Sequence, residues 1–413
     1  MSPAPGQFNG GREAPGGALG RIVRHAYEDA PTVRARFDRA GVNPDEIRSP
    51  EDLARIPVLR KAELTELQKG APPFGGLLGL SVERLQRIFM SPGPIYDPQG
   101  PIEDFWRWGG GLRTAGFGPG DIVLNTFSYH LSPAGFMFDA AARSLGCVVV
   151  PAGVGNTELQ ARILADLGVT AYTGTPSFLM TLLEKARELG CETRKLTKAF
   201  VTAEMLPTSL RQRFAAEFEI EVYQGYGTAD AGCVAHECGH REGMHVAGAG
   251  AIVEILDPET RGPAPPGEMG EIVVTVLDET YPLIRFGTGD LSAWMTEPCP
   301  CGSQALRLKG ILGRLGDSVK VRGMFVHLKQ VEEVMARFAE VARYQVTVTR
   351  KDHRDDLTFH LELAGEPANP MAVAARLEGL VRDVIRLRPE IDFVTRGTIP
   401  EGAKKLVDER KWD

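Results

Sequence analysis

Short apolar segments alternate with amphipathic segments through the middle of the chain. The apolar segments at 122–126, 148–151, 171–174, 199–202 and 221–224 predict strands, and the segments at 136–145, 157–167, 177–189 and 206–218 predict helices. Strands that alternate with helices of this length indicate βαβ units and a parallel sheet. Because ligands of such sheets bind beyond the carboxyl ends of the strands, the turns after these strands are expected to face one crevice.

The flanking regions have different patterns. Upstream, the sequence predicts helices over 19–40 and 102–115, with short helices and turns over 43–67. Downstream, it predicts strands at 251–256, 270–277 and 291–295, then helices at 330–338 and 371–386 and strands at 344–350 and 357–363. The chain is therefore predicted to have an α/β fold. A large N-terminal domain (1–313) combines parallel-sheet βαβ units with an antiparallel subdomain (246–312), and a small α+β C-terminal domain follows (317–413).

Composition narrows the class of protein. The 413 residues carry 54 acidic and 47 basic side chains, which argues against nucleic acid or an anionic membrane as a partner. No apolar run approaches the roughly 18 residues that cross a bilayer. The N-terminus lacks the pattern of a signal peptide. We therefore expect a soluble cytoplasmic protein.

Two motifs carry candidate nucleotide chemistry. Residues 224–230, Gln-Gly-Tyr-Gly-Thr-Ala-Asp, follow a predicted strand. Their glycines let the backbone approach a phosphate, the Thr228 hydroxyl can bond to it, and the Asp230 carboxylate can bind Mg²⁺. Alone, this segment is more simply interpreted as a tight turn. Residues 285–290 end in Asp290, whose carboxylate can accept hydrogen bonds from both hydroxyls of a ribose.

These two segments and residues 310–323, in this order and spacing, resemble the adenylate-forming superfamily of acyl-CoA synthetases, and within it the phenylacetate-CoA ligase family. Residues 125–130, 151–153, 175–177 and 256–260 also match. The resemblance implies a two-step reaction. A carboxylic acid, with an aromatic, phenylacetate-like acid favoured, attacks ATP to give acyl-AMP and pyrophosphate, with Mg²⁺ neutralising phosphate charge. The small C-terminal domain then rotates as a lid, and the thiol of coenzyme A displaces AMP to form a thioester. A homodimer is compatible with the sequence.

The resemblance also implies roles for individual residues. Thr228 would contact the α-phosphate, Asp230 would bind Mg²⁺, and Tyr226 would stack on adenine. The implied nucleotide-binding set is Ala203, Glu204, Gly225, Tyr226, Gly227, Thr228, Asp230, Asp290 and Arg314. Tyr129, His130 and Phe136 would flank the acyl pocket, with packing in an aromatic core as the alternative.

The chain departs from the superfamily pattern at three places. The phosphate loop, at 90–100, has three prolines and no Lys, so we expect it to be stiff and to bind pyrophosphate weakly. The nearest upstream cation is Arg87. In the C-terminal loop, a one-residue gap makes Lys404 the catalytic candidate, with Lys405 as the second candidate and two solvated surface lysines as the alternative. Gly316 stands at the expected hinge, where glycine permits the backbone change that rotation needs.

Cysteine and histidine cluster in two segments. Cys233, His236, Cys238, His240 and His245 fall within 13 residues, and Cys299 and Cys301 follow later. In a reducing cytosol this pattern favours tetrahedral Zn²⁺ over disulfides, with free buried cysteines as the alternative. The resemblance implies a structural zinc held by Cys238, His245, Cys299 and Cys301, with His240 as the substitute for His245. Cys147 and Cys191 are assigned to the core.

Three functions remain open on these residues. The leading one is an ATP-dependent acid–CoA ligase. The second is a nucleotide-binding regulator or scaffold of the same fold that has lost adenylation, which the missing loop Lys favours and the intact motifs disfavour. The third is an adenylate-forming ligase with an acceptor other than CoA. A dinucleotide-binding enzyme is rejected because the glycines at 109–111 do not follow a predicted strand.

Overall fold

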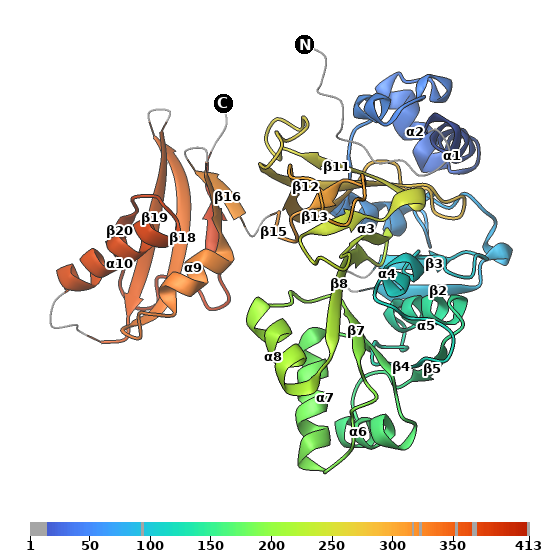
Figure 1. The fold of residues 1–413 in the computed structure, drawn as a ribbon. Coiled ribbons are helices and arrows are strands. Elements are labelled where there is room, and N and C mark those ends of the chain that lie inside the picture. The colour runs from blue at the N-terminus through green and yellow to red at the C-terminus, as the bar shows by residue number, and fades with distance from the viewer. Residues whose placement is uncertain are drawn as a thin grey trace. The chain divides into compact units, whose positions relative to one another are not determined.

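The computed structural model of the chain describes residues 15–91, 95–315, 318–321, 324–351, 354–365 and 370–410. It divides into two compact units, Met1–Leu312 and Gly313–Asp413 (Figure 1). The expectations for loop residues 92–94 and for Gly316 lie outside the described residues. No helix among the described residues is long and apolar enough to cross a bilayer.

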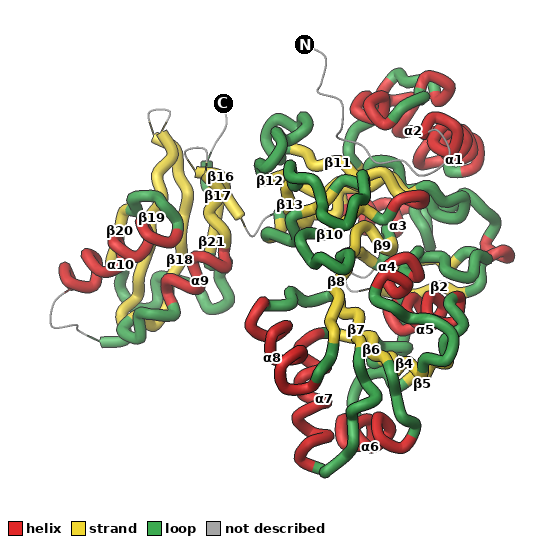
Figure 2. The backbone as a smooth tube through the Cα atoms, viewed as in Figure 1, coloured by secondary structure: helices red, strands yellow, loops and turns green. Residues whose placement is uncertain are grey.

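The larger unit contains a sheet with the strand order β14-β10-β9-β8-β7-β6-β4-β5 (Figures 1 and 2). Its strands are β4 (Ile122–Asn125), β5 (Val148–Pro151), β6 (Ala171–Gly174), β7 (Lys198–Val201), β8 (Glu221–Thr228), β9 (Gly232–His236), β10 (Met244–Val246) and β14 (Arg307–Leu308). Strands β5, β4, β6, β7 and β8 pair in parallel, so their carboxyl ends share one edge. Strands β9, β10 and β14 extend the sheet in antiparallel pairing. The α/β fold predicted from the sequence is confirmed.

Helices cover both faces of this sheet. They are α4 (Gly109–Thr114), α5 (Ala134–Ser144), α6 (Thr157–Asp166), α7 (Pro176–Glu188) and α8 (Thr208–Phe218). Neighbouring residues of a strand point to opposite faces. Thus Ala199 packs in a core with residues of α6, α7 and α8, while Phe200 packs in a second core with residues of α4 and α5. Helix α7 begins where Thr175 Oγ1 accepts a hydrogen bond from the backbone N–H of Phe178, next to a proline at the first helical position.

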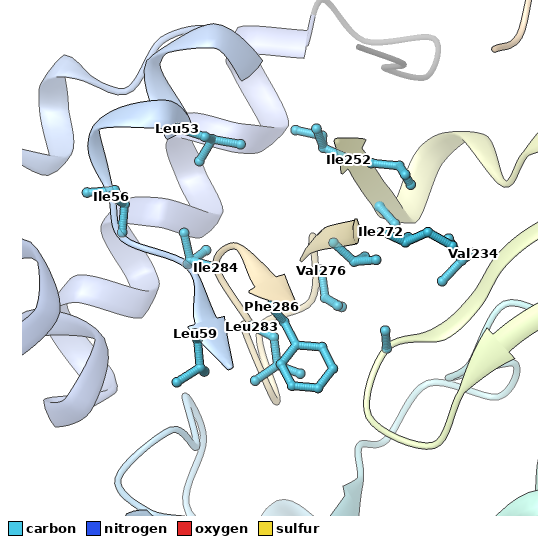
Figure 3. Close-up of a cluster of buried hydrophobic side chains, with 14 of the residues drawn as sticks. Leu53, Ile56, Leu59, Val234, Ile252, Ile272, Val276, Leu283, Ile284 and Phe286 are labelled. Atoms are coloured by element: carbon cyan, nitrogen blue, oxygen red, sulfur yellow. The ribbon is translucent and has the colours of Figure 1, made fainter. Parts of the chain in front are cut away.

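A second sheet in the same unit has the order β1-β13-β12-β11. Its strands are β1 (Leu59–Arg60), β11 (Ala251–Leu256), β12 (Met269–Val276) and β13 (Phe286–Ala293). Strands β11, β12 and β13 are antiparallel, whereas β1 pairs in parallel with β13. Leu59, Ile252, Ile272 and Phe286 belong to one buried cluster (Figure 3). A buried ion pair of 2.8 Å joins Arg285 to Glu254 beside this cluster.

The N-terminal segments complete this unit. They are the helices α1 (Pro15–Asp29), α2 (Pro31–Ala40) and α3 (Lys61–Gly70), the hairpin of β2 (Arg87–Ser91) and β3 (Ile95–Gln99), and the short 3-10 helices Pro44–Glu46, Pro50–Arg55, Val82–Arg84 and Gly248–Gly250. The prediction of one helix over 19–40 is wrong. Ala30 has extended backbone angles because the residue before a proline is forced out of the helical region, and α2 restarts at Pro31.

Three further sequence predictions are corrected. The helix expected over 102–115 is only the six residues of α4. The apolar segment at 148–151, whose composition favours a buried strand, is strand β5 but lies at the sheet edge, and Val148 is 64% exposed. Residues 225–228 were expected in a turn, yet they belong to strand β8, because β9 pairs back onto them.

The smaller unit has its own core. It contains β15 (Gly313–Arg314), β16 (Ser318–Val321), β17 (Met324–His327), α9 (Leu328–Met335), β18 (Val341–Lys351), β19 (Arg354–Leu363), α10 (Pro370–Val384), β20 (Glu390–Phe393) and β21 (Leu406–Asp408). A sheet of order β20-β19-β18-β21 packs with α9 and α10 around Val346, Phe359 and Leu377. The unit thus has the α+β organisation that the alternating pattern predicts.

Candidate active site

Strands β8 and β13 bring two predicted nucleotide residues together from different sheets. The Tyr226 hydroxyl donates a hydrogen bond of 2.9 Å to Asp290 Oδ2. Both side chains are buried, and Asp290 lies within strand β13. This hydrogen bond fixes the position of the Asp290 carboxylate relative to the edge of the parallel sheet.

Strand β8 ends at Thr228, and the turn from β8 to β9 carries Asp230. Thr228 Oγ1 accepts a hydrogen bond of 3.0 Å from the backbone N–H of Ala231, which closes the turn. The hydroxyl hydrogen of Thr228 remains a donor. The last residue of β8 and the turn after it therefore supply a hydroxyl and a carboxylate at the carboxyl end of this strand.

The glycines of β8 have a packing reason for their identity. A Cβ atom at Gly225 would lie 2.6 Å from Phe200 and 2.9 Å from Trp108, and one at Gly227 would lie 2.2 Å from the Gly232 carbonyl oxygen. No side chain fits at these distances. The motif predicted glycines that let a phosphate approach the backbone, whereas the described contacts explain both glycines by packing.

Asp230 is paired with a lysine that the sequence analysis did not single out. Lys61 Nζ lies 3.0 Å from Asp230 Oδ2, and the Asp230 side chain is 0% exposed. Asp230 Oδ1 has no hydrogen-bond partner among the described residues. A buried carboxylate oxygen without a hydrogen-bond partner suits a cation, so the Asp230 side chain fits a magnesium ligand.

A second buried carboxylate lies beside Asp230. Asp97, on β3 of the hairpin that corresponds to the phosphate loop, is 1% exposed. Burial, with the nearby negative charge of Asp230, raises the pKa of Asp97 to about 8. The hairpin therefore presents a buried acid close to Asp230.

The turn after β7 carries Ala203 and Glu204. Ala203 has a φ of 69°, a left-handed conformation that is uncommon for a residue with a Cβ atom. Glu204 Oε2 accepts a hydrogen bond of 3.3 Å from the Ser177 N–H, which links this turn to the start of α7. Thr202 Oγ1 donates to the Gly225 carbonyl oxygen at 2.8 Å. The Thr202 bond holds the turn against β8, and the Glu204 bond holds it against α7.

Two of the three predicted acyl-pocket residues lie together. The rings of Tyr129 and Phe136 pack edge to face with centroids 5.2 Å apart. The Tyr129 hydroxyl accepts a hydrogen bond of 2.8 Å from Asn125 Nδ2. His130 is exposed instead. The Arg87 guanidinium lies 4.7 Å from the centre of the Phe136 ring, so this upstream cation is engaged with the aromatic pair.

The remaining predicted residues belong to the smaller unit. Lys405 Nζ forms an ion pair of 2.8 Å with Glu332 and lies 5.5 Å from the centre of the Tyr344 ring. Lys404 is exposed, and its carbonyl oxygen accepts a hydrogen bond from Gln345. Arg314 is also exposed. Lys405 is therefore engaged within its own unit, whereas the Lys404 side chain is exposed.

The predicted zinc ligands converge. Cys238, His245, Cys299 and Cys301 offer ligand atoms that all lie within 4.8 Å of one another. The Cys238 and Cys299 sulfurs are 3.7 Å apart, and Cys301 Sγ is 3.4 Å from His245 Nε2. A tetrahedral zinc with Zn–S bonds of about 2.3 Å places its sulfurs about 3.8 Å apart, so the donor set fits zinc.

His245 is the one histidine of the four converging residues, and burial lowers its pKa, which favours the neutral form that binds metals. His236 and His240 lie outside this cluster. His240 is exposed and does not belong to the group of four. His236 Nδ1 is instead within 3.0 Å of the Glu237 carbonyl oxygen.

A parallel sheet whose strand ends carry this hydroxyl, carboxylate and tyrosine, followed by a small α+β unit, defines an AMP-binding enzyme of the adenylate-forming class. Comparison with known families agrees. Residues 106–276 match the AMP-binding enzyme family, and residues 323–410 match the AMP-binding enzyme C-terminal domain.

Curated relatives identify the family more narrowly. A phenylacetate-coenzyme A ligase of Thermus thermophilus is 32% identical over 84% of this chain and 80% of its own length. One of Aromatoleum evansii is 30% identical over 94% of this chain and 92% of its own length. The chain belongs to the phenylacetate-coenzyme A ligase family and is an adenylate-forming acid–CoA ligase.

A solved structure has the same fold. An open conformation of 2-hydroxyisobutyryl-CoA ligase in complex with 2-HIB-AMP and CoA aligns with a TM-score of 0.81 and 25% identity. The alignment covers 95% of this chain and 90% of that one. The α/β assignment therefore rests on the sheet order and on this likeness together.

Sequence reasoning missed Lys61 and Asp97. Lys61 lies 169 positions from its partner Asp230 in the sequence, and it follows an apolar segment that gives no sign of a charged partner. Asp97 stands in a proline-containing segment, where no local pattern shows that its carboxyl group is buried beside Asp230. The signal that the sequence offers is the lack of a lysine in the phosphate loop, which implies that another element supplies the cation.

Proposed function

We propose that the protein activates a carboxylic acid with ATP to acyl-AMP and then forms a thioester with coenzyme A, and that the acid is aromatic and phenylacetate-like. The Tyr226–Asp290 hydrogen bond carries the proposal, because it supports a ribose-binding carboxylate beside the turn that holds Thr228 and Asp230. The edge-to-face pair of Tyr129 and Phe136 supports an aromatic wall for the acid.

The proposed chemistry assigns separate work to the chain's own residues. Asp290 would hold the ribose, and the Thr228 hydroxyl would donate to the α-phosphate. Asp230 would hold Mg²⁺, which supplies positive charge against the phosphate oxygens when bound. In the smaller unit Lys404 would add a cation during adenylation. Catalysis on this account is positioning plus charge neutralisation, since phosphoryl chemistry requires little else from the protein.

The cysteine and histidine cluster is proposed as a structural zinc centre. Four protein ligands fill a tetrahedral zinc site, so no position remains for a reacting water. The centre would join the β9–β10 segment, which carries Cys238 and His245, to the segment of Cys299 and Cys301. We also propose a cytoplasmic location, because the free cysteines suit a reducing compartment. We propose a homodimer, because the exposed edge strand β5 offers a surface on which a second copy could pair.

Acid-dependent pyrophosphate release tests the proposed function. Purified protein would be assayed with ATP and Mg²⁺ against phenylacetate, benzoate and aliphatic acids, each with and without CoA. We expect release with phenylacetate above the aliphatic acids, and thioester only when CoA is present. Release with aliphatic acids alone would overturn the aromatic assignment, and adenylate without thioester would point to a different acceptor. Sedimentation equilibrium would test the dimer.

A further inference from the structure

The hairpin of β2 and β3 does not offer a cation to the turn that carries Asp230. Between residues 88 and 100 the sequence contains neither Lys nor Arg. Arg87, at the start of β2, donates from Nη1 to Gln99 Oε1 at 3.1 Å and lies over the Phe136 ring. Buried Arg107 donates to the Ala231 carbonyl oxygen, so it is committed to the backbone of the turn. A polyphosphate at this turn therefore needs a positive charge from another element.

Lys61 is anchored beside the candidate nucleotide residues. It is the first residue of α3 and directly follows β1. Strand β1 pairs in parallel with β13, which carries Asp290, with Leu59 opposite Phe286 (Figure 3). The backbone of Lys61 is thus held against the same strand that presents the proposed ribose ligand.

The Lys61 side chain is partly exposed to solvent and contacts a buried carboxylate. It is 40% exposed, whereas Asp230, 3.0 Å away, is 0% exposed. An ammonium group has three N–H donors, and the structure describes one of them as bonded to Asp230. Among the described residues Asp230 is the hydrogen-bond partner of this ammonium, so its two other donors can bond to oxygens that approach from the solvent side.

Two acids and one base make up this cluster. Asp97 and Asp230 are both buried, and Lys61 forms an ion pair with Asp230 and acts electrostatically on Asp97. The Asp230 carboxylate, 3.0 Å away, holds the Lys61 ammonium in place, because pulling a positive charge away from a buried carboxylate is costly. Lys61 is therefore a positioned cation rather than a freely moving surface side chain.

We propose that Lys61 binds the β- and γ-phosphates of ATP and so replaces the lysine that the phosphate loop lacks. This inference rests on the proposed use of ATP. It predicts a contact that ATP makes and AMP does not, since AMP has no phosphates beyond the first.

Nucleotide binding tests this inference without any catalytic turnover. Isothermal titration would compare ATP and AMP, each with Mg²⁺ and with EDTA, on the unmodified protein and on Lys61→Ala, Lys61→Arg and Lys69→Ala. Lys69 is the matched control, because it lies on the same helix in an exposed ion pair with Glu66. Lys61→Ala should weaken ATP binding by about tenfold or more, the scale of a lost hydrogen bond to a charged group, and should leave AMP binding unchanged.

The variants separate phosphate binding from a structural role. Lys61→Arg should recover most of the ATP affinity, and Lys69→Ala should bind both nucleotides normally. Equal loss of ATP and AMP affinity in Lys61→Ala would show that the residue only supports the fold, and would overturn the inference. Unmodified protein that binds ATP no better than AMP would overturn it as well.

The same experiments distinguish a failure of the ligase proposal from a failure of the Lys61 inference. If the unmodified protein prefers ATP over AMP through Lys61 but releases no pyrophosphate with any acid, the inference stands and the ligase proposal fails. If pyrophosphate is released normally by Lys61→Ala at low ATP, the ligase proposal stands and the inference fails. In the ligase, Lys61→Ala should raise the KM for ATP, and it should leave thioester formation from synthetic acyl-adenylate intact because that substrate carries no β- or γ-phosphate.

Discussion

Tyr226 and Asp290 belong to different sheets and meet through one buried hydrogen bond of 2.9 Å. The bond links the end of β8, in the parallel sheet, to β13, in the antiparallel one. Neither residue alone could define a nucleotide site. Together they place an aromatic ring and a carboxylate on neighbouring strands, at the edge where the parallel strands have their carboxyl ends.

Replacing Asp290 with Ala should weaken AMP binding. The change removes the proposed acceptor of the ribose hydroxyls and leaves the buried Tyr226 hydroxyl without its acceptor, so we expect a loss of about 1–3 kcal/mol. Isothermal titration with AMP measures it. Tyr226→Phe is the control, because it removes the inter-sheet bond but keeps the carboxylate, and it should cost less. Unchanged AMP affinity in Asp290→Ala would show that the ribose lies elsewhere.

Metal analysis of protein purified without chelator should give about one zinc per chain. Cys299→Ser and Cys301→Ser should each lose the metal and lower the melting temperature, because each removes one of four converging ligands. Cys191→Ser serves as the control, since Cys191 is a free cysteine outside the cluster. Metal-free protein with full thermal stability would rule out the zinc centre.

Lys404 and Lys405 should behave differently. Lys404→Ala should slow adenylation by about 10²–10³, the scale of one lost transition-state contact, and should spare thioester formation from synthetic acyl-adenylate. Lys405→Ala should mainly lower stability, because it removes the ion pair with Glu332. Pyrophosphate release and thioester formation are measured separately for each variant. Selective loss of adenylation in Lys405→Ala alone would reverse the assignment.

Asp121 should make stability depend on acid pH. Burial opposes ionisation of this carboxyl, but hydrogen bonds from Lys198, Thr170 and the Gly118 N–H outweigh it and hold the pKa below the ordinary 3.8. A depressed pKa in the folded state stabilises the fold above pH 3.8 and loses that contribution as the pH falls through the lower, folded value.

The free energy of unfolding of Asp121→Asn tests this. At about pH 7 the variant should be less stable than the unmodified protein by about 1–3 kcal/mol, because Asn keeps the shape but loses charged hydrogen bonds. The difference should shrink toward about pH 3 and below. A difference that does not change with pH would mean that the carboxylate charge contributes nothing.

The alternation of apolar and amphipathic segments was sufficient to predict most of the parallel sheet. Strand β6, for example, occupies the predicted residues 171–174. Local periodicity could not show that β8 continues through Thr228, because that extension depends on pairing with β9. Nor could it find β1, whose two residues become a strand only by pairing with β13.

The candidate site follows the same division. Motif spacing was enough to nominate Tyr226, Asp230 and Asp290, and cysteine spacing was enough to nominate the four converging zinc ligands. The partner of Asp230 could not be predicted, since Lys61 is brought to it by tertiary packing across 169 positions. The exposure of His130 was also beyond the sequence, because the position of a turn residue depends on how the following helix packs.

One measurement tests the central claim most directly. The unmodified protein would be incubated with ATP, Mg²⁺, phenylacetate and CoA, and the products would be identified by mass spectrometry beside the same reaction with Asp290→Ala. The account predicts phenylacetyl-CoA and AMP in equal amounts with the unmodified protein and a strong reduction of both with the variant. Absence of AMP and thioester from the unmodified reaction, or undiminished product from Asp290→Ala, would contradict it.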